Sequence, residues 1–154
     1  MRTTSTANER AVSASAVTVQ FACGSSGLPA AARIRRWVEA ARPGAAQITV
    51  RIVGAREGRS LNLAFRGKDR ATNVLAFPYG KQRGALQGDV VLCGPVIARE
   101  AKAQGKELSA HYAHLTVHAV LHLRGYLHDD DAQANRMERA ERSILRRLGY
   151  PDPY

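Results

Sequence analysis

The amino-acid sequence predicts a single-domain α+β protein in which a mixed sheet of about four strands is surrounded by helices. Its 154 residues suit one domain with a core of ordinary size. Short segments rich in β-branched residues alternate with longer segments whose apolar residues recur at helical spacing. The chain has no internal repeat, and no apolar run approaches the roughly 18 residues of a membrane-spanning helix.

Four strands are expected from local composition. They lie at residues 16–22, 46–53, 72–78 and 88–93. The first two alternate apolar and polar side chains, which is the pattern of a strand with one buried face. The third, TNVLAFP, is closed by Pro78, and a glycine-containing loop then leads to the fourth, GDVVLC.

Five helices are expected around these strands. They lie at residues 28–42, 56–67, 94–105, 108–125 and 130–149. In the first helix, apolar residues recur at helical spacing around Trp37, and Pro43 ends it. The fourth helix ends at Gly125. The fifth has acidic residues at its N-terminus and arginines near its C-terminus, which suits the helix dipole.

The beginning of the chain differs in composition from the rest. Residues 1–15 are rich in Ser, Thr and Ala, so we expect a disordered tail followed by one folded domain at 16–150. A secretory signal needs a compact apolar segment, which this stretch lacks. The two cysteines, Cys23 and Cys93, are far apart and form neither a disulfide framework nor a CxxC motif. We therefore expect a soluble, intracellular protein without a membrane partner.

The positive charge is concentrated in one part of the chain. The formal net charge is +10, and residues 31–84 hold twelve Lys and Arg against three Asp and Glu. Residues 85–154 hold nine of each sign. A generally arginine-rich composition would raise the charge everywhere, which the neutral second half argues against. A concentrated positive field favours a polyanionic partner such as nucleic acid.

All five histidines lie within residues 111–128. His118 and His122 are four residues apart, the spacing at which two imidazoles on adjacent helical turns can bind one metal ion. His128 follows six residues later and lies beyond Gly125, where the chain can turn and bring a third imidazole to the same face. Three neutral imidazoles leave one tetrahedral position open, which is typical of a catalytic zinc site.

The pattern H-x3-H-x2-G-x2-H is the histidine frame of the metzincin zinc proteases. In that frame the general base is a glutamate directly after the first histidine, and this chain has Ala119 there. Peptide hydrolysis would lack its proton shuttle, so a zinc-dependent hydrolase of this kind is an alternative that needs a carboxylate from elsewhere. Cleavage of a phosphodiester instead needs charge stabilisation on the phosphate, which an arginine supplies.

The roles of the neighbouring polar residues stay open at this point. His111 and His114 could line the pocket, form hydrogen bonds in the core or face solvent. Asp129, Asp130 and Asp131 could orient an imidazole or, as solvated residues, cap the last helix.

Three longer motifs follow one another in the chain: NLAFRGKDRATNVLAFP (62–78), GDVVLC (88–93) and HAVLHLRGYLHDDD (118–131). They resemble the YbeY family of bacterial ribosomal RNA maturation endoribonucleases, in matching order over residues 46–149. The resemblance implies an α+β fold, one Zn²⁺ ion per chain and a cytoplasmic, metal-dependent endoribonuclease specific for single-stranded RNA. It also implies action in maturation of the 16S rRNA 3′ end and in ribosome quality control. The implied partners are rRNA, the small ribosomal subunit, and ribosomal proteins or assembly GTPases.

The resemblance also implies individual residue roles. The implied zinc ligands are His118, His122 and His128, and the family's motif arginine falls on Arg66. We expect Arg66 to hold the scissile phosphate and stabilise its developing negative charge. We expect Lys68 and Arg70 to bind substrate as point charges.

The chain departs from the family pattern at three positions. Ala119 replaces the common glycine, Ala76 replaces the common serine, and Leu127 replaces the usual aspartate before the third histidine. If that aspartate orients a histidine, its loss would loosen the third ligand. A non-catalytic ribosome-assembly factor with a structural metal is the second alternative, because RNA binding and RNA cleavage would use the same basic surface.

Overall fold

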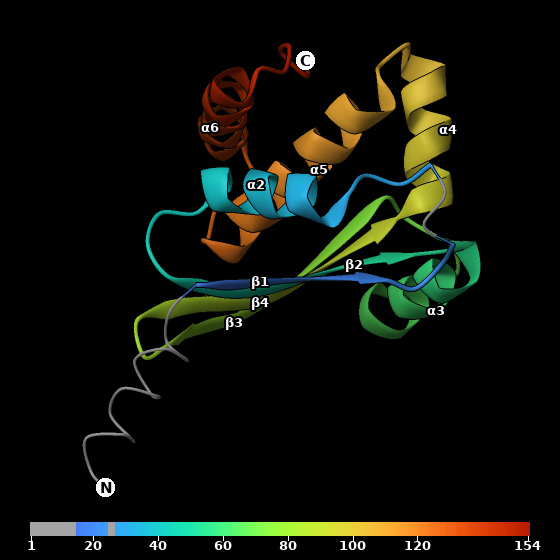
Figure 1. The fold of residues 1–154 in the computed structure, drawn as a ribbon, viewed down its shortest axis with the longest axis horizontal. Helices are drawn as coiled ribbons and strands as arrows, with labels where there is room; N and C mark the ends of the chain where they lie inside the picture. The colour runs from blue at the N-terminus through green and yellow to red at the C-terminus, as the bar shows by residue number, and fades with distance from the viewer. Residues whose placement is uncertain (1–14, 25–26) are drawn as a thin grey trace, which may run out of the picture.

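The computed structural model describes residues 15–24 and 27–154, which form one four-stranded sheet and five helices (Figure 1). The elements follow in the order β1 (Ala16–Phe21), α2 (Ala31–Ala41), β2 (Ala46–Val53), α3 (Ala55–Arg66), β3 (Val74–Gln82), β4 (Ala85–Cys93), α4 (Gly94–Gln104), α5 (Leu108–Leu123) and α6 (Asp131–Leu148). The predicted α+β class is confirmed. The predicted disordered tail falls on residues 1–15, of which 1–14 lie outside the described residues.

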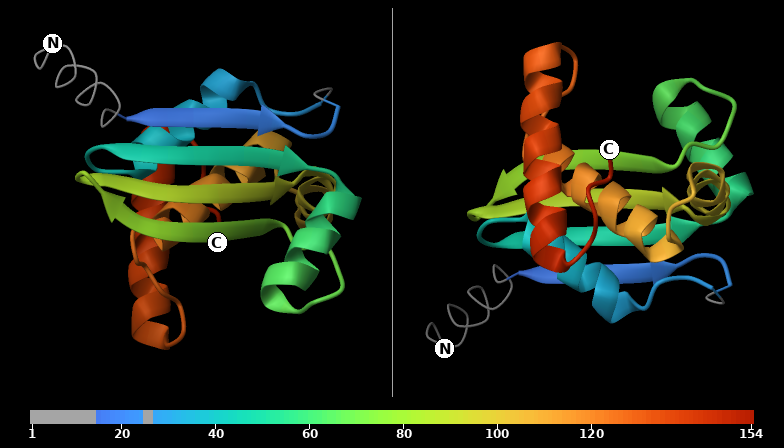
Figure 2. Two further views of the ribbon diagram at one scale, coloured as in Figure 1. Left: turned by 90° about the horizontal axis from the view of Figure 1, so that it is seen from below. Right: turned by 90° about the horizontal axis from the view of Figure 1, so that it is seen from above.

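The sheet is mixed, with strand order β1-β2-β4-β3 (Figure 2). Strands β1, β2 and β4 are parallel, and β3 runs antiparallel to β4. The inner strands β2 and β4 carry several of the buried Val and Ile residues, and Val50 and Val90 are paired and fully buried. Strand β3 lies at an edge of the sheet, where its outer side is open to a ligand.

Helix α5 is the central helix of the domain. It packs against β3 and β4 and also contacts α2, α4 and α6, which lie on the same side of the sheet (Figure 1). Its residues are buried nearly all round, as expected of a helix enclosed by protein. Within the described ranges, no helix is both long and apolar enough to cross a bilayer.

Helix α3 lies on the opposite side of the sheet (Figure 1). Beneath it is a second, smaller core made of Val53, Leu75, Val91, Cys93 and Val96. The rest of the core lies on the α5 side and contains Trp37 and Tyr112. Only Gly58 and Asn62 of α3 are buried, so most side chains of this helix face solvent.

The third and fourth strands form a longer hairpin than the sequence predicts. The expected loop after Pro78 is absent, because β3 continues to Gln82 and β4 begins at Ala85. Arg83 and Gly84 both have positive φ, which is typical of a two-residue hairpin turn. The pairing register shifts between Pro78 and Gly80, so a bulge on an edge strand accommodates the proline that was expected to end it.

Candidate metal centre

The structure brings the three predicted histidines together at the end of α5. His118 and His122 lie on adjacent turns of the helix, and one ring nitrogen from each of His118, His122 and His128 lies within 4.8 Å of the others. The ring centroids of His122 are 4.8 Å from those of both His118 and His128. This spacing can accommodate one metal ion bound by three imidazoles.

His128 reaches the cluster because the chain turns sharply after α5. Gly125 has a φ of 100°, a left-handed conformation that other residues rarely adopt. The amide of Tyr126 donates to the carbonyl of Leu121, which closes the end of the helix. The turn at Gly125 therefore does what the sequence predicts, and the ligand roles of the three histidines stay a prediction that this geometry supports.

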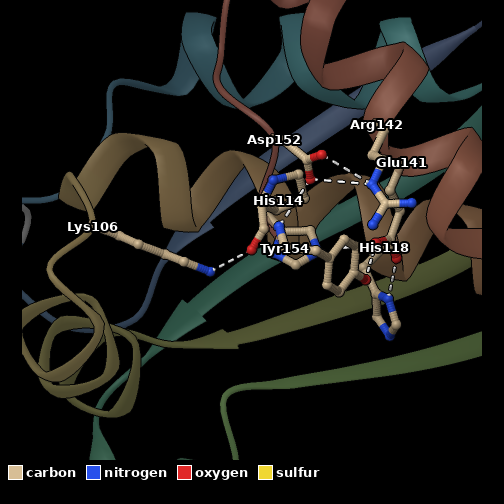
Figure 3. A network of polar contacts seen from close by, with 8 residues as sticks. Lys106, His114, His118, Glu141, Arg142, Asp152 and Tyr154 are labelled. Carbon is tan, nitrogen blue, oxygen red and sulfur yellow. Dashed lines mark hydrogen bonds and ion pairs between the residues drawn. The ribbon is translucent and has the colours of Figure 1, made fainter.

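A fully buried carboxylate lies beside His118, one of the three histidines (Figure 3). Glu141, on α6, has its Oε1 atom 2.5 Å from Nδ1 of His118. Its Oε2 atom lies 3.0 Å from Nε2 of His114 and also accepts the hydroxyl hydrogen of Tyr154. Burial raises the pKa of Glu141, but the hydrogen bonds from His114, His118 and Tyr154 outweigh burial and lower the pKa to about 2.

The ionised carboxylate determines which ring nitrogen of His118 carries a hydrogen. A carboxylate only accepts hydrogen bonds, so Nδ1 of His118 carries the hydrogen. In the neutral imidazole, Nε2 of His118 is then the nitrogen with the lone pair, and this is the tautomer that can bind a metal ion. A carboxylate behind a metal-binding imidazole is a common device for fixing its tautomer and orientation.

The pKa of His122 is lowered, which favours the neutral form that a metal ion requires. Burial lowers its pKa, and the positive charge that His118 and His128 would carry lowers it further. Because protons and metal ions compete for the same lone pair, a low imidazole pKa favours metal binding near neutral pH.

The two remaining histidines form hydrogen bonds in the interior. His111 is 4% exposed, and its Nε2 atom lies 3.0 Å from Oε1 of Glu100. Asn73, at the start of β3, donates to the same carboxylate at 3.0 Å. His114 contacts Glu141 as described above. The crowding of histidines therefore combines three candidate ligands with two side chains that form hydrogen bonds to buried or half-buried carboxylates.

The acidic run after His128 does not supply the carboxylate behind the cluster. Asp130 instead caps α6 by accepting the amide hydrogen of Gln133 at 2.8 Å. Leu127 is exposed and lines the same cavity as the histidines. The orientation of His118 therefore depends on Glu141, which no sequence motif identified.

A groove of about 670 Å³ opens in front of the histidines. Its lining comes from the end of α5, the turn to α6, the first half of β3 and the end of α3. The lining residues are Phe65, Arg66, Thr72, Asn73, Val74, Leu75, Ala76, Phe77, Pro78, His118, Ala119, His122, Leu127, His128 and Asp129. Arg66, predicted from sequence, thus lies in the same groove as the histidine cluster.

The other two predicted cations lie just outside this groove. Lys68 and Arg70 are exposed on the loop after α3 and are not among the lining residues. The carbonyl of Arg70 accepts the side-chain amide of Asn62 at 2.7 Å, and Arg59 forms an ion pair with Asp69 at 2.6 Å. The loop is therefore held in place while its cationic side chains extend into solvent.

An exposed aromatic side chain that the sequence did not single out lies beside Arg66. Phe65 is 64% exposed and packs edge to face against Phe77, with the ring centroids 4.9 Å apart. Tyr79 instead donates to Asp89 at 3.0 Å and lies outside the groove. An exposed, large apolar residue at a groove is a candidate ligand contact.

Fold and site together define an α+β protein whose three-histidine cluster faces a groove that also contains an arginine. A family model described as Endoribonuclease YbeY matches residues 30–149. The chain belongs to this family.

Proteins named Endoribonuclease YbeY from several bacteria are similar to this chain over most of its length. The protein from Thiobacillus denitrificans is 58% identical over 137 residues, which cover 88% of this chain and 93% of that protein. The protein from Stenotrophomonas maltophilia is 54% identical over 148 residues and 92% of its own length. The protein from an Azoarcus species is 58% identical, but the match spans only 51% of its length.

A solved structure supports the fold independently. The solution structure of a Thermotoga maritima protein matches 90% of this chain with a TM-score of 0.59 at 20% sequence identity. The match covers 98% of that protein. At this identity the likeness concerns the fold alone.

Proposed function

We propose that this protein is a zinc-dependent endoribonuclease that cleaves single-stranded RNA, and that it acts in the cytoplasm in maturation of the 16S rRNA 3′ end and in ribosome quality control. Its partners would then be rRNA in the small subunit, with ribosomal proteins or assembly GTPases. The observation that carries the proposal is the groove shared by the histidine cluster and Arg66. Membership of the YbeY family supports RNA as the substrate.

The residues present fit a bound zinc ion. His118, His122 and His128 offer three imidazole nitrogens within 4.8 Å of one another, and Glu141 holds His118 in the tautomer that a metal ion requires. Imidazoles also accept nickel, copper or iron, so the choice of zinc rests on the open three-histidine arrangement. A bound Zn²⁺ ion would supply a Lewis acid that polarises a phosphate and lowers the pKa of water.

Arg66 is the side chain that we assign to the reacting phosphate. A planar guanidinium can donate two parallel hydrogen bonds to a phosphate, and it gains strength as negative charge develops there. Lys68 and Arg70 extend the positive charge away from the groove and would bind neighbouring phosphates. Phe65, beside Arg66, presents an exposed ring on which an unpaired base can stack.

The exposed ring of Phe65 at the groove supports the proposed preference for single strands. Base stacking on Phe65 requires an unpaired base, because the faces of paired bases are covered by their neighbours. Phe65 and Arg66 line the same groove, so a base stacked on Phe65 and a phosphate bound by Arg66 would lie close together. A duplex offers no free base to this wall.

The proposal is tested by removing zinc with a chelator, restoring it stepwise, and measuring cleavage of a labelled RNA. One sample is the single strand, a second is the same strand annealed to its complement, and a third is an unstructured peptide. We expect cleavage of the single strand in proportion to bound zinc and no cleavage of the other two. Peptide cleavage would favour the hydrolase alternative. Tight RNA binding without cleavage at full zinc occupancy would favour a non-catalytic assembly factor.

A further inference from the structure

Residues 149–154 follow α6 and are fastened to the domain at several points. Gly149 ends the helix, and the amide of Tyr150 donates to the carbonyl of Leu145. The hydroxyl of Tyr150 accepts hydrogen bonds from Arg33 at 2.9 Å and from Trp37 at 3.2 Å. The beginning of this segment is therefore anchored on α2 through Tyr150.

Further along, the same segment returns toward α5 (Figure 3). Asp152 accepts from the guanidinium of Arg142 at 3.1 Å, and its carboxylate also accepts the amide hydrogen of Tyr154. Lys106, in the turn before α5, donates to the carbonyl of Pro153 at 2.8 Å. These bonds hold the backbone at residues 152–154 and so fix the direction of the Tyr154 side chain.

Tyr154 ends this path at the carboxylate behind the metal centre. Its ring packs edge to face on His114, with centroids 5.3 Å apart, and the guanidinium of Arg142 lies 5.1 Å from the ring centroid. Its hydroxyl donates to Oε2 of Glu141. Because an ionised carboxylate has no hydrogen to give, the phenol must be the donor.

The two oxygens of Glu141 are used by different partners. Oε2 accepts from His114 and Tyr154, while Oε1 accepts from His118. Rotation of the carboxylate group would break the bonds at both oxygens together. The pair of donors at Oε2 therefore holds Oε1 directed at Nδ1 of His118.

We propose that Tyr154 is a positioning residue of the metal centre, which acts through Glu141 to fix the tautomer and ring orientation of His118. Asp152 and Pro153 hold Tyr154 in place, so a segment outside the helices and the sheet contributes to metal affinity. This inference rests on the proposed function of the three histidines as metal ligands. It assigns a role to a residue that touches neither the metal position nor the groove.

A purely structural role for the segment makes a different prediction. If residues 149–154 only cover the domain, then removing either tyrosine hydroxyl should lower stability and leave the metal centre unchanged. The chain offers a matched pair, because Tyr150 and Tyr154 lie four residues apart and each uses its hydroxyl for hydrogen bonds. Only the hydroxyl of Tyr154 is bonded to Glu141.

The experiment compares Tyr154→Phe, Tyr150→Phe and Glu141→Gln with the unchanged protein. The dissociation constant for zinc is measured by chelator competition, and the absorption spectrum is recorded with Co²⁺ in place of zinc. Both substitutions of tyrosine keep the ring and remove only the hydroxyl. For Glu141→Gln we expect a loss of zinc affinity of roughly 10–100-fold, the range found for partners of metal-binding histidines.

For Tyr154→Phe we expect zinc affinity to fall several-fold and the Co²⁺ spectrum to change, and for Tyr150→Phe we expect neither. In the Glu141→Gln background, removing the Tyr154 hydroxyl should add little, because both changes act along one path. Unchanged zinc affinity in Tyr154→Phe, or an equal fall in both tyrosine variants, would overturn the inference. Absence of zinc binding in the unchanged protein and in all three variants would refute the metal centre itself. Zinc binding that responds to Tyr154 without RNA cleavage would refute only the ribonuclease.

Discussion

The two sides of the groove are built differently. On the histidine side, His118 is bonded to a carboxylate that is itself fully buried and has three donors. On the opposite side, Phe65 and Arg66 line the groove, and Lys68 and Arg70 follow just outside it. All four side chains are exposed, and none of the three cations forms an ion pair within the described ranges. The histidine side is therefore prearranged for a small ligand with strict geometry, and the arginine side is free to adapt to a flexible polymer.

The two sides also differ in what supports them. Helix α5 is enclosed by α2, α4, α6 and the sheet, so its histidines are held by the main core. Helix α3 covers the smaller core, and its loop is held by Asn62 and by one exposed ion pair. Changes on the histidine side should therefore affect stability and metal binding, whereas changes on the arginine side should affect substrate binding and turnover with little effect on stability.

The largest effect on the arginine side is expected from Arg66→Ala. Loss of a donor that stabilises transition-state charge costs on the order of 10²–10³ in kcat, and we expect a decrease of this size. Arg66→Lys should restore only part of the rate, because an ammonium group cannot donate two parallel hydrogen bonds. The measurement is single-turnover cleavage of a single-stranded RNA at full zinc occupancy.

The matched control for Arg66 is Arg56→Ala. Arg56 lies at the other end of α3, is exposed and does not line the groove. Equal loss of rate in both variants would show that α3 contributes only general positive charge. Zinc affinity should be unchanged in Arg66→Ala, and a decrease would contradict the independence of the two sides.

On the histidine side, Gly88→Ala tests how tightly α5 is packed on the sheet. A Cβ atom at position 88 would lie 2.7 Å from both terminal carbons of the Leu123 side chain, which is buried beside His122. Overpacking of this kind costs about 1–3 kcal/mol of stability, and we expect zinc affinity to fall with it. Urea unfolding and zinc titration measure the two effects.

Gly54→Ala is the control for Gly88, because nothing lies within 4 Å of a Cβ atom built there. It should change stability much less and leave zinc binding unchanged. If Gly88→Ala proves as mild as Gly54→Ala, the end of α5 is more adaptable than the structure indicates, and the contrast between the two sides of the groove becomes weaker.

Phe65→Ala should weaken binding of single-stranded RNA. Base stacking on an aromatic ring contributes about 1–3 kcal/mol, so we expect affinity to fall by roughly 5–150-fold while zinc affinity and stability stay nearly constant. Leu63→Ala is the control, since Leu63 is an exposed apolar residue of the same helix that does not line the groove. Equal effects of the two substitutions on RNA binding would rule out stacking on Phe65.

The smallest effect is expected from the ion pair that holds the arginine-side loop. The hydrogen bond from Arg59 lowers the pKa of Asp69 below its usual value. A lowered folded-state pKa stabilises the protein above the unfolded pKa near 4, and this contribution disappears as the pH falls through the folded pKa. Thermal unfolding of Asp69→Asn should therefore differ slightly from the unchanged protein at pH 7, because exposed pairs contribute little. The two proteins should converge as the pH falls below 4 and through the folded-state pKa of Asp69. A constant difference across this range would show that Asp69 acts through its shape and not its charge.

Local patterns predicted most of the fold and the centre of the site, because both depend on spacing along the chain. The i, i+4 histidine pair and Gly125 were sufficient to predict that His128 would join the cluster. The hairpin was missed because Pro78 signals the end of a strand unless the strand is known to be at an edge. Whether a strand lies at an edge depends on the order of strands in the sheet, which local sequence does not show.

Glu141 was missed although the sequence contains a signal for it. It occupies the same stripe of α6 as Met137, Ile144 and Leu145, all of which are buried. A charged residue on the apolar stripe of a helix needs a buried partner. The stripe alone does not identify the partner of Glu141, because His114 and His118 lie on another helix. The nearby aspartates at 129–131 were the more obvious candidates by sequence, yet Asp130 caps α6.

The central claim is that the histidine cluster is the metal centre of an RNA-cleaving enzyme. The most direct test measures zinc content and single-stranded RNA cleavage for the purified protein and for His122→Ala side by side. The account predicts about one zinc ion per chain and cleavage for the unchanged protein, with both lost in the variant. Zinc in the unchanged protein together with equal cleavage by the two proteins would contradict it, since the cleavage would then come from a contaminant or from another site.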